Sequence, residues 1–170
     1  QIYGQGESPM TITAQSRAQF CDALATGDTA FLETVGRPFL GTDVIIADAD
    51  GRALPVGAVG EILVRSRTVV PGYWQQPEAT AATLRDGWLW TGDLGRLDAR
   101  GCLTLAGRSK ETIITGGSNV YPIEVEAALL DHPGVVEAAV VGEVDAEWGE
   151  RVVAYVVLGD GLAADDAHGV

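Results

Sequence analysis

The alternation of apolar and polar positions predicts mainly antiparallel β-structure over residues 40–107. Apolar runs at 43–47 and 61–66 are the clearest strands, because each is short, rich in β-branched residues and bounded by turn-forming residues. Residues 48–51, Asp-Ala-Asp-Gly, are typical of a turn, and a return strand is expected near 52–55. Within the second run, side chains should alternate between the two faces of the sheet.

A second hairpin is predicted around residues 98–101, Asp-Ala-Arg-Gly, which lie between two mostly apolar segments. A turn centred in this segment would place Asp93 opposite Ala106, so that Asp93 and Arg108 emerge at the same end of the ribbon. A carboxylate accepts hydrogen bonds and a guanidinium donates them, which suits the two hydroxyls of a vicinal diol. An ordinary surface ion pair, worth less than about 1 kcal/mol, is the alternative.

The pattern changes after Arg108 and predicts a small α+β unit. Residues 122–130 predict a helix that starts with proline, carries two glutamates early and stops before a Pro-Gly pair. Strands are expected at 111–115, 135–141 and 151–158. The expected core of this unit is apolar: Val125, Leu129, Val136, Val140, Val153 and Val156. The remaining segments predict an extended stretch at 8–13, helices at 14–25 and 77–84, loops at 26–38 and 116–119, and a frayed end at 159–170.

Composition and charge exclude several classes of partner. The 170 residues are 46% hydrophobic and 21% charged, which is typical of a globular protein with a substantial core. The net charge of −13 argues against nucleic acid or an anionic membrane as a partner. No apolar run approaches the roughly 18 residues that a membrane span needs. Cys21 and Cys102 lack metal-ligand spacing and are expected to be reduced, as in a cytoplasmic protein.

Six motifs occur in the order seen in adenylate-forming enzymes, a superfamily of acyl-CoA synthetases, luciferases and peptide-synthetase adenylation domains. They are Tyr3-Gly4-Gln5-Gly6-Glu7, Gly60-Glu61-Ile62, Gly72-Tyr73-Trp74, Gly87-Trp88-Leu89-Trp90-Thr91-Gly92-Asp93, Gly107-Arg108-Ser109-Lys110 and Gly116-Gly117-Ser118-Asn119-Val120-Tyr121-Pro122. The chain resembles this superfamily from Tyr3 to about Leu158, and it is most similar to acyl-CoA synthetases, the fatty-acid or related acid–CoA ligases.

The resemblance implies an α+β fragment that is truncated at both ends. Residues 1–107 would be the β-rich end of the large N-terminal domain, and residues 108–170 an incomplete small α+β C-terminal subdomain. The family's phosphate loop has no counterpart here. Lys110 is the only lysine, and the family's adenylation lysine lies near the end of its small C-terminal domain, so that lysine is not present. We therefore expect the 170 residues alone to show no pyrophosphate exchange above background.

The resemblance also implies a nucleotide site. Tyr3 would lie against the adenine, and Gly4 and Gln5 would continue that wall. Asp93 would accept hydrogen bonds from both ribose hydroxyls, and Arg108 would contact the same sugar. Since the adenylation lysine is absent, no complete catalytic set is expected.

Metal, hinge and acceptor roles follow from the same resemblance. Glu7 would help to hold Mg²⁺, for which a carboxylate is a suitable hard oxygen ligand. Gly6 departs from the family, which usually has Thr or Ser there. Lys110 would lie at the hinge between the two domains. Gly116 and Gly117 would line the tunnel for the pantetheine arm of CoA, or simply form a turn.

The implied parent enzyme activates a carboxylic acid as acyl-AMP and transfers it to CoA, with ATP and Mg²⁺, as in fatty acid metabolism. Two alternatives stay open. One is an adenylation domain that loads a carrier protein. The other is a non-catalytic remnant that binds a nucleotide or self-associates through surfaces that once met the missing part.

Overall fold

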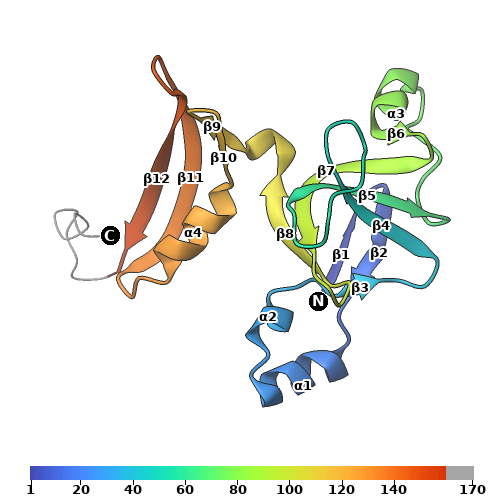
Figure 1. Ribbon diagram of the computed structural model, residues 1–170, viewed down its shortest axis with the longest axis horizontal. Helices are drawn as coiled ribbons and strands as arrows, with labels where there is room; N and C mark the ends of the chain where they lie inside the picture. Colours follow the sequence, from blue (N-terminus) through green and yellow to red (C-terminus); the bar gives the residue numbers. More distant parts are fainter. Residues whose placement is uncertain (160–170) are drawn as a thin grey trace. The chain divides into compact units, whose positions relative to one another are not determined.

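The structure, a computed structural model, describes residues 1–159, and the chain divides into two compact units. The first unit is Gln1–Leu105, and the second begins at Ala106. Figure 1 labels their helices and strands. The expected fraying of 159–170 falls almost entirely outside the described residues. Within residues 1–159 no helix is both long and apolar enough to cross a bilayer.

Two antiparallel sheets form most of the first unit. The smaller sheet has the order β1-β2-β3, with β1 at Ile2–Gln5, β2 at Ser8–Ala14 and β3 at Arg37–Pro38. The larger sheet has the order β4-β5-β7-β6, and β8 pairs with β7. Its strands are β4 (Thr42–Ala47), β5 (Gly60–Ser66), β6 (Leu84–Arg85), β7 (Trp88–Leu97) and β8 (Leu103–Arg108). The strand pairs are antiparallel, which confirms the α+β prediction.

The core of the first unit is centred on β5. Ile62 and Val64 are fully buried, as the alternation of the strand predicts. Leu63 points to the opposite face and is also only 2% exposed, so both faces of the strand centre are covered. Arg65 lies further out, over the ring of Trp88 at 4.5 Å. The buried cluster consists of Tyr3, Ile12, Ile46, Ile62, Val64, Leu89 and Leu103.

Three helices belong to the first unit: α1 (Arg17–Thr26), α2 (Thr29–Leu32) and α3 (Pro77–Thr83). Ser16 explains where α1 begins, because its Oγ accepts from Gln19 N at 3.2 Å and Gln19 Oε1 accepts from Ser16 N at 2.9 Å. The expected loop at 26–38 was wrong in part, since it contains α2 and β3. Asp28 caps α2 by accepting from Phe31 N at 3.1 Å.

The two Asp-Ala-x-Gly segments fold into the same turn. Gly101 N donates to Asp98 O at 2.9 Å and Asp98 N to Cys102 O at 3.0 Å, with Gly101 at φ +74°. The left-handed glycine adds one residue to the turn, so Asp98 faces Cys102. The predicted turn at 98–101 is present, but its pairing register differs by one residue from that of a turn centred between Ala99 and Arg100, so it does not place Asp93 opposite Ala106.

The twin turn at 48–51 has the same bonds, with Gly51 N to Asp48 O and Asp48 N to Arg52 O, both at 3.0 Å. The return strand expected after it is reduced to a single bridge between Ala47 and Ala53. Pro55, which cannot donate to a ladder, follows directly and limits the pairing.

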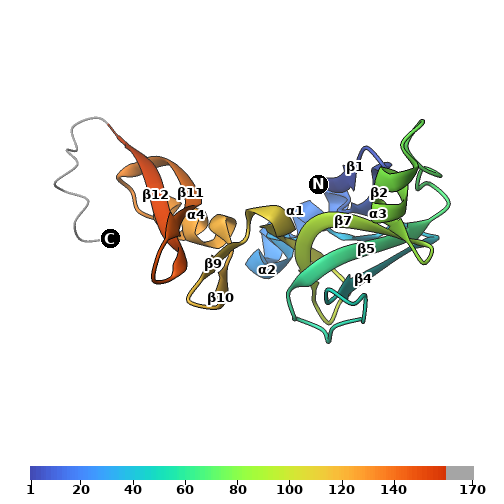
Figure 2. The same cartoon turned by 90° about the horizontal axis from the view of Figure 1, so that it is seen from above.

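The second unit contains a sheet with the order β10-β9-β12-β11 and the helix α4 (Figure 2). Its elements are a 3-10 turn (Ser109–Glu111), β9 (Ile113–Thr115), β10 (Ser118–Val120), α4 (Pro122–Leu130), β11 (Val135–Asp145) and β12 (Gly149–Leu158). The expected helix at 122–130 is confirmed. The expected loop at 116–119 was wrong in part, because its second half forms β10.

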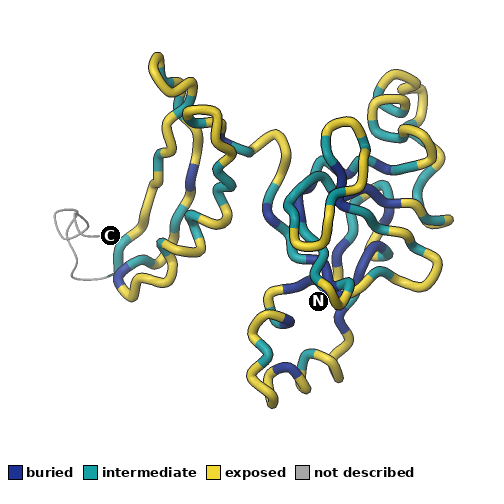
Figure 3. Tube along the Cα trace, in the orientation of Figure 1, coloured by how far each residue is buried: buried dark blue, intermediate teal, exposed yellow. Residues whose placement is uncertain are grey.

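The predicted core of the second unit is only partly buried. Val140 is 6% exposed, but Val136 and Val156 are 59% and 38% exposed and were wrong as core residues. Helix α4 packs along β11, which leaves most of β12 exposed (Figure 1 and Figure 3). Val136 lies at an irregularity in the pairing of β11 with β12, and Val156 lies on the strand that α4 does not cover. The other three members are half-buried: Val125, Leu129 and Val153.

Replacing Asp98 with alanine should destabilise the first unit by about 1 to 2 kcal/mol, because two backbone donors lose their acceptor. Asp98 Oδ1 accepts from Arg100 N at 2.9 Å and from Cys102 N at 2.8 Å. Burial raises the pKa of Asp98, but these hydrogen bonds and the Arg100 guanidinium outweigh it and hold the pKa below its usual range. The contribution of ionised Asp98 to the free energy of unfolding is therefore present above about pH 4 and lost as pH falls through the lowered pKa. Urea unfolding at pH 7 and pH 3 measures both effects.

Asp48→Ala is the matched control for Asp98→Ala. Asp48 Oδ1 accepts from Asp50 N and Arg52 N, both at 2.9 Å, in a turn that supports only one bridge. We expect a smaller loss there, because less ordered structure depends on that turn. Equal stability of Asp98→Ala and the parent protein at pH 7 would contradict the assignment.

Candidate functional site

Strands β1 and β7 bring Tyr3 and Asp93 together in the interior of the first unit. Tyr3 Oη donates to Asp93 Oδ2 at 2.7 Å, although the two residues lie 90 positions apart in the sequence. Tyr3 is 7% exposed and Asp93 is 8% exposed. The sequence proposed both residues for one site but did not predict this bond. The phenol holds one carboxylate oxygen in a fixed direction, and a carboxylate has further lone pairs that can accept from other donors.

Asp93 is positioned by an irregular stretch of β7. The register between β5 and β7 shifts at this point, and Gly92 has φ +70°. Thr91 Oγ1 donates to Ile62 O at 2.8 Å and accepts from Asp93 N at 3.1 Å. Gly92 N donates to Glu61 Oε1 at 3.0 Å. A bulge of this kind re-aims a side chain, and here side-chain hydrogen bonds replace the interrupted ladder.

The fold requires glycine at position 4 but not at position 6, on either side of Gln5. A Cβ on Gly4 would lie 2.4 Å from Met10 N, so the close approach of β2 requires glycine. A Cβ on Gly6 would meet nothing within 4 Å, and Gly6 is not among the glycines with positive φ. The fold therefore has room at Gly6 for the Ser or Thr that the resemblance implies at this position.

Glu7 lies in the two-residue connection between β1 and β2, where Gln5 pairs with Ser8. Tyr73 Oη donates to Glu7 Oε1, and Val70 N donates to Glu7 O at 2.8 Å. The hydrogen bond to Glu7 raises the pKa of Tyr73, so the phenol stays a donor. Sequence reasoning missed Tyr73, although its place in the Gly72-Tyr73-Trp74 motif was a signal.

The acidic residues of residues 1–159 do not build a metal site by themselves. Nowhere in that range do three or more His, Cys, Asp or Glu side chains gather so that they could hold a metal ion. Mg²⁺ is commonly held by one or two carboxylates, with phosphate oxygens and water completing the octahedron. The single carboxylate of Glu7 fits that donor set when a nucleotide supplies the remaining ligands.

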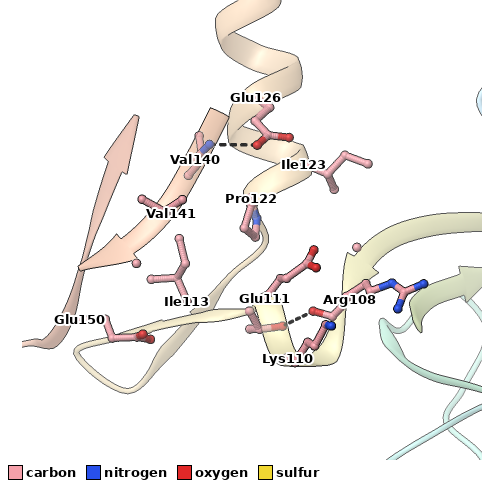
Figure 4. A pocket seen from close by; sticks show the side chains of 13 residues that line it. Arg108, Lys110, Glu111, Ile113, Pro122, Ile123, Glu126, Val140, Val141 and Glu150 are labelled. Carbon is pink, nitrogen blue, oxygen red and sulfur yellow. Dashed lines mark hydrogen bonds between the residues drawn. The ribbon is translucent and has the colours of Figure 1, made fainter. Parts of the chain in front are cut away.

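Arg108 and Lys110 lie in the second unit, at the rim of a cavity of about 460 Å³ between α4 and the sheet (Figure 4). Two of its carboxylates are held by backbone donors. Glu126 Oε1 accepts from Val140 N at 2.9 Å, and Glu150 Oε2 accepts from Ile114 N at 2.7 Å. These bonds tie α4 to β11 and β12 to β9, so both glutamates have a structural role.

Gly116 and Gly117 form the turn between β9 and β10, where Thr115 pairs with Ser118. Their φ values are +55° and +81°. Positive φ at both positions is the signature of the tight turn that suits a two-residue hairpin, and glycine adopts it at little cost. A Cβ on Gly116 would also lie 2.7 Å from Trp148 Cε3. The turn explains both glycines locally.

The predicted site residues are distributed over both units. Tyr3 and Asp93 are brought into contact, and Gly4, Gln5 and Glu7 follow Tyr3 on the same hairpin. Four other candidates belong to the second unit: Arg108, Lys110, Gly116 and Gly117. Because the two units are described separately, the approach of Asp93 and Arg108 to one sugar stays a prediction.

Comparison with known proteins defines the class of this chain. Residues 1–74 match the AMP-binding enzyme family, and residues 124–168 match the AMP-binding enzyme C-terminal domain. The chain therefore belongs to the adenylate-forming, AMP-binding enzyme family, which confirms the resemblance of its six motifs.

Named relatives make the class more specific. The chain is 42% identical over 166 residues to a medium/long-chain-fatty-acid–CoA ligase of Mycobacterium tuberculosis, covering 98% of this chain and 28% of the relative. It is 40% identical over 161 residues to a fatty acid–[acyl-carrier-protein] ligase of Streptomyces coeruleorubidus, covering 95% of this chain and 30% of the relative. The structure of o-succinylbenzoate CoA synthetase from Bacillus subtilis with ATP and magnesium matches with a TM-score of 0.81 and 35% identity. The match covers 98% of this chain and 33% of the synthetase. The chain thus spans 28 to 33% of the length of these relatives.

Replacing Tyr3 with phenylalanine should lower the stability of the first unit by about 1.5 to 3 kcal/mol, because a buried hydrogen bond to a carboxylate is lost. Urea unfolding followed by tryptophan fluorescence reports on this unit, which holds Trp74, Trp88 and Trp90. Tyr155→Phe is the control, since it removes a hydroxyl from Glu143 at an exposed position. A loss no larger for Tyr3→Phe than for Tyr155→Phe would contradict the role of the buried bond.

Proposed function

We propose that this chain is part of an acid–thiol ligase, an acyl-CoA synthetase. The enzyme would activate a carboxylic acid with ATP as an acyl-adenylate and then transfer the acyl group to CoA. The observation that carries the proposal is the buried hydrogen bond between Tyr3 and Asp93, in a chain that belongs to the adenylate-forming family. A buried carboxylate with one oxygen already oriented is well suited to accept both hydroxyls of a ribose.

The first unit would supply most of the nucleotide contacts. Asp93 binds the ribose hydroxyls in this proposal, and Tyr3, Gly4 and Gln5 line the adenine. The ring of Tyr3 belongs to the core cluster, so the role of Tyr3 that is best supported is holding the Asp93 carboxylate. Glu7 would hold Mg²⁺ together with phosphate oxygens, and the metal would neutralise charge on the phosphates.

The second unit would supply the parts that change between the two half-reactions. We propose that residues 1–107 end the large N-terminal domain and that the C-terminal subdomain follows from residue 108. Arg108 would contact the same ribose, and Lys110 would be the hinge, which agrees with its place in a short 3-10 turn between two strands. Gly116 and Gly117 would line the CoA tunnel, and the space beside Gly117 is open, since a Cβ there would meet nothing within 4 Å.

Replacing Asp93 with asparagine should weaken the binding of AMP by about 10- to 100-fold, because a charged acceptor for the ribose hydroxyls becomes a neutral amide. Calorimetric titration of the protein that carries this chain measures the affinity. Asp50→Asn is the control, because Asp50 is an exposed carboxylate in the 48–51 turn. Unchanged affinity in Asp93→Asn would overturn the proposed ribose contact.

A carrier protein is the second candidate for the acyl acceptor, and the similarity to a fatty acid–[acyl-carrier-protein] ligase favours it. The two acceptors share the phosphopantetheine arm, so the turn at Gly116 and Gly117 serves either one. With CoA as the acceptor, we expect thioester formation by the full protein to saturate with free CoA. Mass spectrometry of products formed with CoA and with a phosphopantetheinylated carrier protein decides between them. Acylation of the carrier protein alone would overturn the CoA assignment.

Self-association stays a prediction of the sequence. The residues that support it are exposed apolar side chains on one face of β11 and β12. Val141 is 42% exposed, Tyr155 59% and Val157 51%.

A further inference from the structure

Tyr73 makes a contact that links two motifs far apart in the sequence. Its hydroxyl donates to Glu7 Oε1, although the two residues are separated by 66 positions. Both lie in the first unit and both are partly buried. The proposed function gives the Gly72-Tyr73-Trp74 motif no role, and this contact with Glu7 suggests one.

The segment before Tyr73 holds the backbone beside Glu7. Val70 N donates to Glu7 O at 2.8 Å. Thr68 Oγ1 lies 3.3 Å from Ser8 Oγ and 2.9 Å from Thr11 Oγ1, within hydrogen-bonding distance of both. Ser8 is fully buried, Thr11 is half-buried and Thr68 is exposed, so this hydroxyl cluster runs from the interior to the surface. The turn that carries Glu7 is therefore held by hydrogen bonds to the backbone of Glu7 and to the side chain of the next residue, Ser8.

Tyr73 is itself fixed by helix α3. Its backbone N–H donates to Thr80 Oγ1 at 2.9 Å, and Thr80 Oγ1 donates to Gln76 O at 2.8 Å. A Cβ on Gly72 would lie 2.7 Å from Thr80 Cγ2, so glycine is what lets the segment approach the helix this closely. The phenol thus comes from a segment that is hydrogen-bonded to a helix, and a donor held in this way restricts the rotamers of the carboxylate that it contacts.

We propose that Tyr73 is a positioning residue for Glu7, which fixes one carboxylate oxygen so that the other is presented to a nucleotide-bound divalent cation. The inference rests on the proposed function, in which Glu7 takes part in holding Mg²⁺. A carboxylate that accepts one hydrogen bond keeps free lone pairs for a metal. Hydrogen-bonding partners of metal ligands orient them, and their loss typically lowers metal affinity by about 10- to 100-fold.

The test compares Tyr73→Phe with the parent protein in the full-length enzyme. Mn²⁺ replaces Mg²⁺, and its electron paramagnetic resonance signal measures how much metal is bound in the presence of ATP. We expect Tyr73→Phe to weaken this metal binding about 10- to 100-fold. Its binding of ATP in EDTA should stay within about twofold of the parent. Tyr155→Phe, which removes a hydroxyl from Glu143, should change neither quantity.

A merely structural role for Tyr73 gives a different result, because a loosened loop would weaken metal-free and metal-dependent binding together. The double variant with Glu7→Gln sharpens the test. Once Glu7 has lost its charge, Tyr73→Phe should cause no further loss of metal affinity. Additive losses, or parent-like metal affinity in Tyr73→Phe, overturn the inference.

The outcomes also separate this inference from the proposed function. If the parent protein binds no ATP, or if Glu7→Gln leaves metal binding unchanged, the proposed function or its metal role fails. If Glu7→Gln weakens metal binding and Tyr73→Phe does not, only the positioning role of Tyr73 fails.

Discussion

The hydrogen bond between Tyr3 and Asp93 is the interaction on which the candidate site depends. A carboxylate that is 8% exposed has lost most of its hydration, and such burial is costly unless donors replace the water. Tyr3 supplies one donor at 2.7 Å from a ring packed in the core. The core therefore sets the direction of the carboxylate, and packing around β1 is coupled to the geometry of the site.

Backbone irregularities do much of the positioning around this bond. The register shift between β5 and β7 turns Asp93 out of the regular pleat, and Gly4 allows β2 to approach β1 closely. A regular ladder would direct the side chain elsewhere. Bulges and close glycine contacts are common where a fold holds functional groups, because they trade ladder hydrogen bonds for a specific direction.

The sequence predicted elements well where local signals decide them, as for the helix at 122–130 and the strands β4 and β5. It failed where a distant contact or a single backbone conformation decided the outcome. Gly101 adds a residue to the β7–β8 turn, and Val156 is exposed because α4 packs along the neighbouring strand. The motifs identified Asp93 and Glu7, but the bonds to Tyr3 and Tyr73 span 90 and 66 positions and have no local pattern.

The net charge of −13 places a further constraint on how an acidic chain can bind a polyanionic nucleotide. A carboxylate repels phosphates, yet it binds the neutral hydroxyls of a ribose without that penalty. A second carboxylate can assist only when a divalent cation stands between it and the phosphates. Asp93 and Glu7 are proposed for these two roles, the ones in which an acidic side chain favours nucleotide binding. The same reasoning explains why Glu7 needs a fixed direction. A carboxylate free to rotate would meet the phosphates as often as the metal, and the hydroxyl of Tyr73 limits that rotation.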